Sequence, residues 1–310
     1  MNETCFFHKM QDGTMHNIYR CEPENPTEIK GIIQLVHGSC EHSARYREFA
    51  EYLTSNGYIM IANDLRGHGQ TAKKEEDLGF IAHDDGWYKL IGDLLEVNHL
   101  IKQDYPGSKI IMIGHSMGSF LARHYALIYS ETIDGLIAIG TAHQSKLELT
   151  AGILVAKLCM KFKGNRSKGE FLNKLTYERF NKHLEAPLTK SDWITHDRSV
   201  VDDFIADERC GFIFSNSAFR DMFTGLLFIT DRYHIENGPR QLPILLLSGA
   251  QDPVSNNGIQ VKKAYQEYKA AGVEKIDMTL YPNMRHEILN ELDKNLVYAD
   301  IVNWMETFTP

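Results

Sequence analysis

The chain has 310 residues and a formal net charge of −8, with 43% hydrophobic, 10% aromatic and 24% charged residues. This composition is typical of a globular protein with a substantial apolar core, so it excludes disordered, collagen-like and coiled-coil proteins. The acidic balance argues against a nucleic acid partner, because proteins that bind nucleic acid need a net or strongly localised positive field. The length fits two domains or one large core with an insertion.

Neither the N-terminus nor the cysteines indicate export. Charged residues such as Glu3 and Lys9 interrupt segment 1–13, so it has no apolar region of a signal peptide. The strongly apolar stretch 153–160 contains Lys157 and is far shorter than the roughly 20 residues of a membrane-spanning helix. The five cysteines form an odd set without a C-x-x-C pair, which favours neither a disulfide framework nor a zinc knuckle. We therefore expect a cytoplasmic protein.

In chain order, two segments around Phe6 and Ile18, separated by Asp12-Gly13, predict a β-hairpin. Short runs rich in β-branched residues then alternate with segments of helical period, which predicts βαβ units and a mainly parallel sheet. The predicted strands are 32–36, 58–62, 110–113, 136–139, 244–247 and 276–280. The predicted helices of this region are 47–56, 87–104, 117–129, 258–271 and 296–308. The expected fold class is α/β, with a doubly wound sheet.

The alternation of strands and helices is interrupted after the fourth of these strands. Residues 141–236 have a helical or irregular pattern, so we expect an inserted cap there and a core formed by 1–140 and 237–310. The first cap helix, predicted at 147–162, is amphipathic and runs into five basic residues: Lys157, Lys161, Lys163, Arg166 and Lys168. Such a run fits a weak peripheral contact with an anionic membrane, although a solvated helix face is its commoner origin.

The segment Gly114-His115-Ser116-Met117-Gly118 is a G-x-S-x-G sequence between the predicted strand 110–113 and the predicted helix 117–129. The pattern alone arises by chance in about one chain in ten of this length. The strand and helix on its two sides, however, are typical of a nucleophile elbow, which exposes the serine above the sheet. The helix N-terminus beneath it favours negative charge. Ser116 is therefore the predicted nucleophile.

A serine hydroxyl needs a base to take its proton and a carboxylate to orient that base. In sheets of this kind the order along the chain is serine, acid, histidine. His286 is the only histidine after the predicted strand 244–247, so it is the predicted base. Asp252 follows the same strand at the carboxyl edge of the sheet and is the predicted acid. Asp277 lies within a strand and Glu287 beside the histidine, so both should point away from it.

The backbone N–H groups of Ser39 and Met117 are the expected donors to an oxyanion, one after the first central strand and one after the nucleophile. We expect no cofactor and no metal. The segment 67–72 matches a dinucleotide-binding pattern, but charged residues without a helical period follow it. The pair His286-Glu287 opens like a zinc motif, but Asn290 stands where the second ligand is needed.

Five segments, in this order, resemble the monoacylglycerol lipase and lysophospholipase group of the α/β-hydrolase superfamily. They are HGSCEHSARY (37–46), DLRGHG (64–69), GHSMG (114–118), DPV (252–254) and HE (286–287). The resemblance covers about residues 10–140 and 240–310. It implies an α/β-hydrolase fold with an inserted helical cap.

The resemblance also assigns roles to particular residues. It implies a catalytic triad of Ser116, Asp252 and His286, oxyanion donors at Ser39 and Met117, and a structural loop at 64–69. Two residues, Cys40 and Ala44, stand where the family usually has glycine.

Apolar side chains of the cap could line a channel for an acyl chain, and as a group they favour a lipid-like substrate over a sugar or nucleotide. The first candidates are Ile153, Leu158, Phe219 and Phe223. The wider set adds Leu154, Phe162, Phe212, Phe214, Leu226, Leu227 and Phe228. For any one of these, burial against the core is the more common role.

The leading hypothesis is a serine hydrolase that cleaves esters of monoacylglycerols or lysophospholipids through an acyl-enzyme. Two alternatives keep the triad: a short-chain carboxylesterase, and an aminopeptidase of the proline iminopeptidase type. The aminopeptidase needs a cap carboxylate for the free amine of its substrate, and the candidates are Glu170, Glu178, Glu185 and Asp192. A further alternative is a ligand receptor on this fold without catalysis, which an inert Ser116 would indicate.

Overall fold

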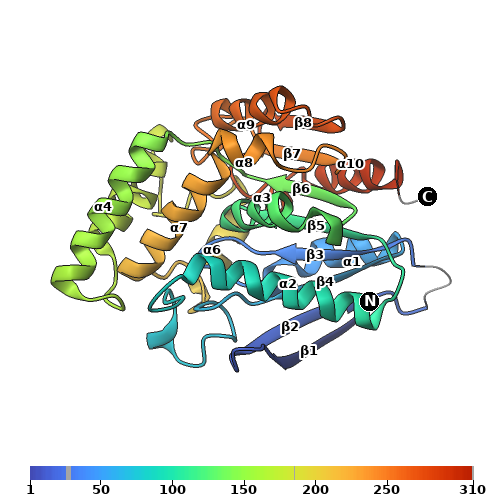
Figure 1. Ribbon diagram of the computed structural model, residues 1–310, viewed down its shortest axis with the longest axis horizontal. Helices are drawn as coiled ribbons and strands as arrows, with labels where there is room; N and C mark the ends of the chain where they lie inside the picture. The colour runs from blue at the N-terminus through green and yellow to red at the C-terminus, as the bar shows by residue number, and fades with distance from the viewer. Residues whose placement is uncertain (26–28, 185, 309–310) are drawn as a thin grey trace.

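The computed structural model describes residues 1–25, 29–184 and 186–308. An eight-stranded sheet forms its centre, in the order β1-β2-β4-β3-β5-β6-β7-β8 (Figure 1). The strands are β1 (Asn2–Lys9), β2 (Met15–Glu22), β3 (Gly31–Val36), β4 (Tyr58–Asn63), β5 (Ile110–His115), β6 (Gly135–Ile139), β7 (Ile244–Gly249) and β8 (Ile276–Tyr281). β1 pairs antiparallel with β2 and β2 with β4, and all later neighbours are parallel. The predicted hairpin and doubly wound α/β sheet are confirmed.

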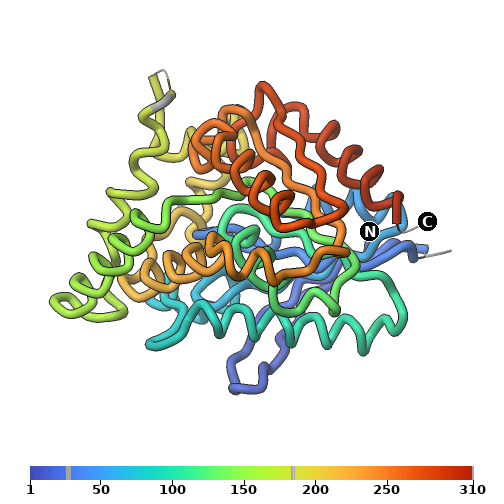
Figure 2. The backbone as a smooth tube through the Cα atoms, turned by 45° about the horizontal axis from the view of Figure 1, so that its top comes forward, coloured from blue at the N-terminus to red at the C-terminus, as the bar shows by residue number. Residues whose placement is uncertain are grey.

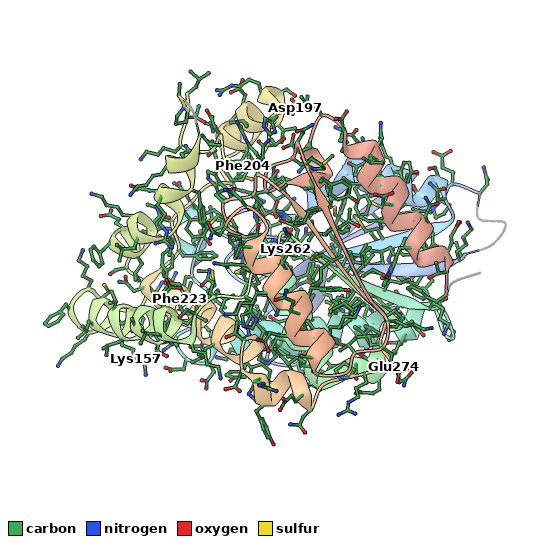
Figure 3. All side chains as sticks on the ribbon, turned by 90° about the horizontal axis from the view of Figure 1, so that it is seen from above. Lys157, Asp197, Phe204, Phe223, Lys262 and Glu274 are labelled. Carbon is green, nitrogen blue, oxygen red and sulfur yellow. The ribbon has the colours of Figure 1, made fainter. Side chains whose placement is uncertain are left out.

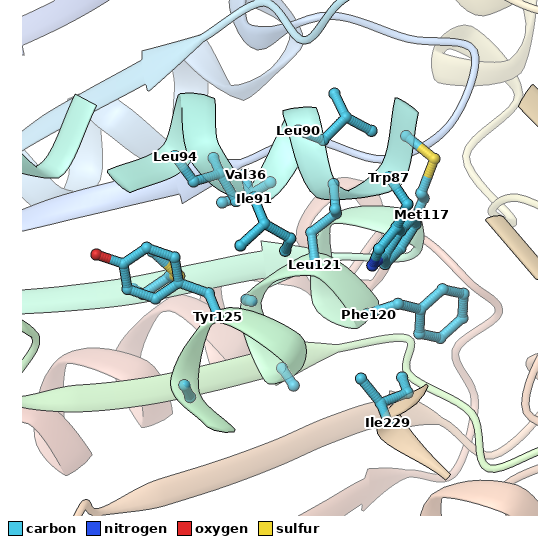
Figure 4. Close-up of a cluster of buried hydrophobic side chains, with 14 of the residues drawn as sticks. Val36, Trp87, Leu90, Ile91, Leu94, Met117, Phe120, Leu121, Tyr125 and Ile229 are labelled. Atoms are coloured by element: carbon cyan, nitrogen blue, oxygen red, sulfur yellow. The ribbon is translucent and has the colours of Figure 1, made fainter. Parts of the chain in front are cut away.

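Helices cover both faces of the sheet (Figures 1 and 2). One face carries α2 (Gly86–Asp104), α3 (Met117–Tyr129) and α9 (Ile259–Ala270), and the other carries α1 (Arg47–Ser55) and α10 (Lys294–Glu306). Because side chains alternate along a strand, β3 serves both layers. Ile32 and Val36 join the cluster with α2 and α3, whereas Ile33 and Leu35 join the cluster with α1 and α10. Figure 4 shows Val36 within the first cluster.

The segment 141–236 contains helices and, within its described residues, no strand beyond one isolated bridge between Lys168 and Ser215. Its helices are α4 (Lys146–Lys163), α5 (Glu170–Leu175), α6 (Arg198–Ala206), α7 (Asn216–Ile229) and α8 (Arg232–Glu236). α4 packs along α7, and α7 contacts α2 and α3 (Figures 1 and 2). A Cβ atom on Gly225 of α7 would overlap the ring of Trp87, so glycine allows this close approach. We propose that 141–236 is the cap and that 1–140 and 237–310 form the core.

Five short 3-10 helices complete the secondary structure of the described chain. They are η1 (Ser43–Tyr46), η2 (Glu75–Asp77), η3 (Ser130–Thr132), η4 (Tyr177–His183) and η5 (Ile288–Asn290). Within the described residues, no helix combines the length and the apolar character needed to cross a bilayer.

Candidate active site

Ser116 lies at a sharp turn between β5 and α3. Its backbone has φ 52° and ψ −121°, a conformation that is strained for a residue with a side chain. A Cβ atom on Gly114 would overlap the carbonyl of Gly118, and one on Gly118 would overlap the carbonyl of Val36. The Ser116 N–H donates to the Ile139 carbonyl at 2.9 Å. The G-x-S-x-G sequence therefore forms the expected elbow, with Ser116 at the carboxyl end of the central strand.

His286 and Asp252 meet beside this elbow. His286 Nδ1 lies 3.0 Å from Asp252 Oδ1, in a contact whose direction departs from that of a hydrogen bond. The same Oδ1 accepts from the Val254 N–H at 2.8 Å, and Oδ2 accepts from Ser248 Oγ at 3.2 Å. Because both residues are almost completely buried, the carboxylate is held next to the imidazole away from bulk water. Such contacts commonly tighten only when substrate is bound.

The imidazole of His286 is held between other rings. Its centroid is 4.8 Å from that of His115 and 5.1 Å from that of Trp193. A Cβ atom on Gly140 would come within 2.9 Å of His286 Cε1, so this glycine makes room for the ring. His286 Nε2 is buried and has no hydrogen-bond partner within the described chain, and His286 lines the same cavity as Ser116. That nitrogen can therefore accept a proton from a group in the cavity.

The loop after β3 carries Ser39, and a hydrogen-bonded histidine fixes its shape. His37 Nδ1 lies 2.7 Å from the Gly38 carbonyl, and His37 Nε2 accepts the Leu65 N–H at 2.9 Å. Burial lowers the pKa of His37, which keeps the ring neutral with its proton on Nδ1. The other expected donor, the Met117 N–H, is at the first position of α3. The two expected oxyanion donors thus lie near Ser116, one on the loop after β3 and the other at the start of α3.

Cys40 adopts the backbone conformation that glycine prefers at this point of the family motif. Its φ is +57°, in the left-handed region, and its carbonyl accepts the Gly211 N–H at 2.9 Å. Cys40 therefore adopts a conformation that a glycine would adopt without strain. Its neighbour Ser39 accepts a hydrogen bond at Oγ from the Tyr177 hydroxyl at 2.9 Å, which links the loop to the segment 141–236.

A group of buried charges lies directly behind this loop. Glu41 accepts hydrogen bonds from the Gly38 N–H at 2.5 Å and from the Tyr46 hydroxyl at 2.8 Å. Arg45 contacts Glu41 at 2.5 Å and binds both carboxylate oxygens of Glu287 at 2.8 and 2.7 Å. The Glu287 carboxylate thus binds Arg45, which agrees with the expectation that it is not the triad acid.

These contacts set the protonation of the buried charges. Burial alone raises the pKa of Glu41, but Arg45 and His115 outweigh it and hold the pKa well below its usual range. His115 Nδ1 lies 3.3 Å from Glu41. Burial alone lowers the pKa of His115, but the contact with Glu41 outweighs burial and raises it. Sequence reasoning did not identify this group, although the i,i+4 spacing of Glu41 and Arg45 is a pattern typical of ion pairs.

The loop at 64–69 has the structural role that the resemblance implies. The Asp64 carboxylate accepts hydrogen bonds from Asn17 Nδ2 at 3.0 Å, from the Ser43 N–H and hydroxyl at 2.9 and 2.7 Å, and from the Gln70 N–H at 2.8 Å. A Cβ atom on Gly69 would overlap this carboxylate. No helix begins within 67–72, so the dinucleotide pattern has no helix N-terminus behind it.

A cavity of about 190 Å³ opens over Ser116. Its lining is Gly38, Ser39, Cys40, Glu41, His115, Ser116, Asn173, Tyr177, Glu178, Lys190, Ser191, Trp193, Ile194, Phe204, Gly211, Phe212, Ile213, His286 and Glu287. Of the eleven apolar cap residues considered for an acyl channel, only Phe212 belongs to it. Phe219 and Phe223 are buried, and the Phe219 ring lies behind Tyr177 with a centroid separation of 6.2 Å. Ile153 is partly buried against the core, and Leu158 is 48% exposed on α4.

The four cap carboxylates considered for an amine have different positions. Glu178 lines the cavity and is exposed at its rim. Asp192 accepts hydrogen bonds from the Leu188 N–H, the Thr189 hydroxyl and Arg198, so other groups already occupy its carboxylate. Glu170 begins α5 outside the cavity lining, and Glu185 lies outside the described residues.

A family model and two curated relatives that match this chain agree with one another. A family model for serine aminopeptidase, S33, matches residues 27–293. The monoacylglycerol lipase of Mycolicibacterium smegmatis is 23% identical over 282 residues, covering 90% of this chain and 89% of the relative. The monoglyceride lipase of Homo sapiens is 24% identical over 294 residues, covering 93% of this chain and 87% of the relative.

Solved structures agree with these relatives. The crystal structure of a highly thermostable carboxyl esterase from Bacillus coagulans, in complex with glycerol, has a TM-score of 0.91 and 27% identity and covers 100% of both chains. A soluble variant of the Saccharomyces cerevisiae monoglyceride lipase, solved with a substrate analogue, has a TM-score of 0.76 and 20% identity, covering 99% of this chain and 96% of that one. The chain has the α/β-hydrolase fold and belongs to the serine aminopeptidase, S33, family.

Proposed function

We propose that this protein, a carboxylic ester hydrolase, cleaves lipid-like esters such as monoacylglycerols or lysophospholipids through an acyl-enzyme on Ser116. The observation that carries the proposal is the 3.0 Å contact between His286 and Asp252 beside the serine elbow. The named activities of the monoacylglycerol lipase relatives support the choice of substrate class.

In the proposed reaction, Ser116 Oγ attacks the ester carbonyl and gives its proton to His286 Nε2. The N–H groups of Ser39 and Met117 donate to the oxyanion, and Asp252 stabilises the imidazolium. The alcohol leaves with the proton from His286. Water then attacks the acyl-enzyme, gives one proton to His286 and releases the fatty acid, and Ser116 regains its proton.

The size of the cavity supports a small head group. The cavity of about 190 Å³ is small, which suits a glycerol-sized head group at the ester. Polar side chains at the cavity, including Asn173, Glu178 and Ser191, can bind hydroxyl groups.

The outer face of α4 supports a weak contact of the cap with a lipid surface. Apolar side chains of this face are strongly exposed, at 79% for Leu147, 60% for Leu154 and 79% for Phe162. Lys157 lies on the same helix, at the edge of the molecule in Figure 3. Exposed apolar residues interleaved with lysines are the pattern of helices that lie on anionic bilayers.

The aminopeptidase remains the second candidate, because Glu178 offers a carboxylate at the rim of the cavity. Lys190 lines the same cavity and weakens the case, since a lysine disfavours a cationic amine. One assay separates the two functions: p-nitrophenyl esters of increasing chain length, monoacylglycerol and lysophosphatidylcholine, compared with an N-terminal prolyl amide.

We expect the lipid esters to be hydrolysed and the amide to remain intact. We also expect Ser116→Ala and His286→Ala each to lower turnover by roughly 10⁴-fold or more. Preferential cleavage of the amide would favour the aminopeptidase. Ester hydrolysis retained by purified Ser116→Ala protein would contradict the proposed mechanism.

A further inference from the structure

Three side chains of different chemistry meet beside the active-site cavity. His42 precedes η1, whereas Asp207 and Cys210 lie in the loop between α6 and α7. His42 Nε2 is 2.7 Å from Asp207 Oδ2, and the nitrogen, oxygen and sulfur atoms all lie within 4.8 Å of one another. Sequence spacing gave no sign of this cluster, because His42 and Asp207 are 165 residues apart.

The backbone holds this cluster in shape. The Cys210 N–H donates to the Asp207 carbonyl at 2.9 Å, which fixes the turn that brings the two side chains together. The Arg209 N–H donates to Asp207 Oδ1 at 2.8 Å and leaves Oδ2 directed at His42. The His42 and Asp207 side chains are 15% and 35% exposed, so an ion can reach them from solvent, while Cys210 is buried at the inner end.

We propose that His42, Asp207 and Cys210 form a binding site for Zn²⁺ that joins the oxyanion loop to the segment 207–211. An imidazole nitrogen, a carboxylate oxygen and a cysteine sulfur are all ligands that Zn²⁺ uses, and this mixture of soft and hard donors excludes Mg²⁺ and Ca²⁺. Zinc bonds of about 2.0 to 2.3 Å place tetrahedral ligand atoms roughly 3.3 to 3.8 Å apart. The His42 and Asp207 atoms are closer than this, at 2.7 Å, and all three ligand atoms lie within 4.8 Å of one another, so the three side chains are close enough to share one ion. Water supplies the fourth ligand.

The charge within the cluster favours a cation, because the carboxylate of Asp207 lies beside the imidazole and the thiol. The ion displaces the thiol proton of Cys210 to solvent, and the thiolate becomes its sulfur ligand.

The position of the site gives the ion a consequence for the enzyme. The residue after Cys210, Gly211, lines the cavity and donates to the Cys40 carbonyl next to Ser39. A bound ion therefore adds a second link, besides this hydrogen bond, between the oxyanion loop and the segment 207–211 that contributes to the cavity wall.

The binding test uses Co²⁺ and Zn²⁺ on the full chain, and it does not depend on the proposed ester activity. Co²⁺ should produce a near-ultraviolet thiolate-to-cobalt charge-transfer band at one equivalent, which Zn²⁺ removes by competition. Cys210→Ser should abolish the band and weaken Zn²⁺ binding at least tenfold, and Asp207→Asn should weaken binding too. The matched control is Cys159→Ser, because Cys159 is a free cysteine on α4 outside the cluster.

A Co²⁺ complex without the band, or equal Zn²⁺ affinity in the wild type and Cys210→Ser, would overturn the proposal. Circular dichroism and melting temperature without metal establish that each variant folds, and Cys210→Ala provides a second replacement. The melting temperature should rise with Zn²⁺ in the wild type and in Cys159→Ser, but not in Cys210→Ser or Cys210→Ala.

Discussion

Arg45 binds both carboxylate oxygens of Glu287, the residue that follows His286, at 2.8 and 2.7 Å. The same guanidinium reaches Glu41, whose carboxylate accepts the N–H of Gly38. One cation therefore joins the loop of the expected oxyanion donor to the loop of the expected catalytic base. The Arg45 side chain is only 11% exposed and the two glutamates less, so the group is shielded from water.

We expect Arg45→Met to lower the free energy of unfolding by about 3 to 5 kcal/mol, because it leaves two buried carboxylates without their cation. Ester hydrolysis should fall as well, since both loops lose their shared anchor. Urea unfolding and steady-state kinetics measure the two effects. The control is Arg47→Met: this arginine is 58% exposed in its pair with Glu51, so its loss should cost less than about 1 kcal/mol. Equal effects of the two variants would refute a special role for Arg45.

Acid should destabilise the protein through buried neutral histidines. Among the described residues, burial lowers the pKa to about 3 for each of His16, His68, His124 and His143. Each is neutral in the folded chain and takes up a proton on unfolding below its ordinary pKa of 6.5. These histidines therefore cost no stability above about pH 6.5. As the pH drops from there toward 3, the free energy of unfolding falls, and at pH 5 each histidine has lowered it by about 2 kcal/mol.

Two buried acids oppose this trend. Burial raises the pKa of Asp93 and Asp221 to about 6, so between pH 6 and 4 they stay protonated in the folded chain and release a proton on unfolding. The two acids therefore add to the free energy of unfolding as the pH falls through this window. At pH 5 this gain offsets roughly a third of the loss that the four histidines cause. The net expectation is lower stability at pH 5 than at pH 7.

The variant His143→Gln tests the histidine contribution. It should shrink the difference in unfolding free energy between pH 7 and pH 5 by about 2 kcal/mol. His99→Gln, at an exposed position on α2, should leave that difference unchanged. Urea titrations at pH 7 and pH 5 measure this difference for the wild type and for both variants. An identical difference in His143→Gln and the wild type would count against the account.

Much of the fold follows from local sequence pattern. The bounds 117–129 predicted for the helix after the nucleophile are those of α3, because an apolar period and a glycine-flanked elbow mark them. The strands are recognisable since parallel strands are buried on both faces and form short apolar runs. The contact of Asp252 with His286 agrees with the order serine, acid, histidine along the chain. To apply that order, one needs to locate only the ends of β7 and β8.

The cavity could not be predicted in the same way. Trp193 and Arg45 reach the histidine loop from positions 93 and 241 residues away from His286, and no local period records such contacts. From the sequence, the apolar residues found on α7 are predicted to line an acyl channel. In the structure, residues such as Phe219 are buried behind Tyr177. An apolar side chain looks the same in sequence whether it lines a cavity or packs behind one.

The exposed apolar face of α4 leads to a membrane-binding experiment. We expect the double variant Leu154→Ser and Phe162→Ser to lose affinity for anionic vesicles at low salt, because it removes two strongly exposed apolar side chains. Hydrolysis of a short, water-soluble ester should stay unchanged. The control is Leu296→Ser, which removes a side chain of similar exposure, 55%, on α10. Wild-type protein that fails to sediment with such vesicles would dispose of the membrane contact.

The central claim is that Ser116 is a nucleophile activated by His286. Its most direct test is reaction with a fluorophosphonate, followed by intact-mass measurement and peptide mapping. We predict one adduct per chain, located on Ser116, with labelling abolished in Ser116→Ala and strongly slowed in His286→Ala. A folded wild-type protein that remains unlabelled, or carries its adduct at another residue, would contradict the account and favour a non-catalytic receptor.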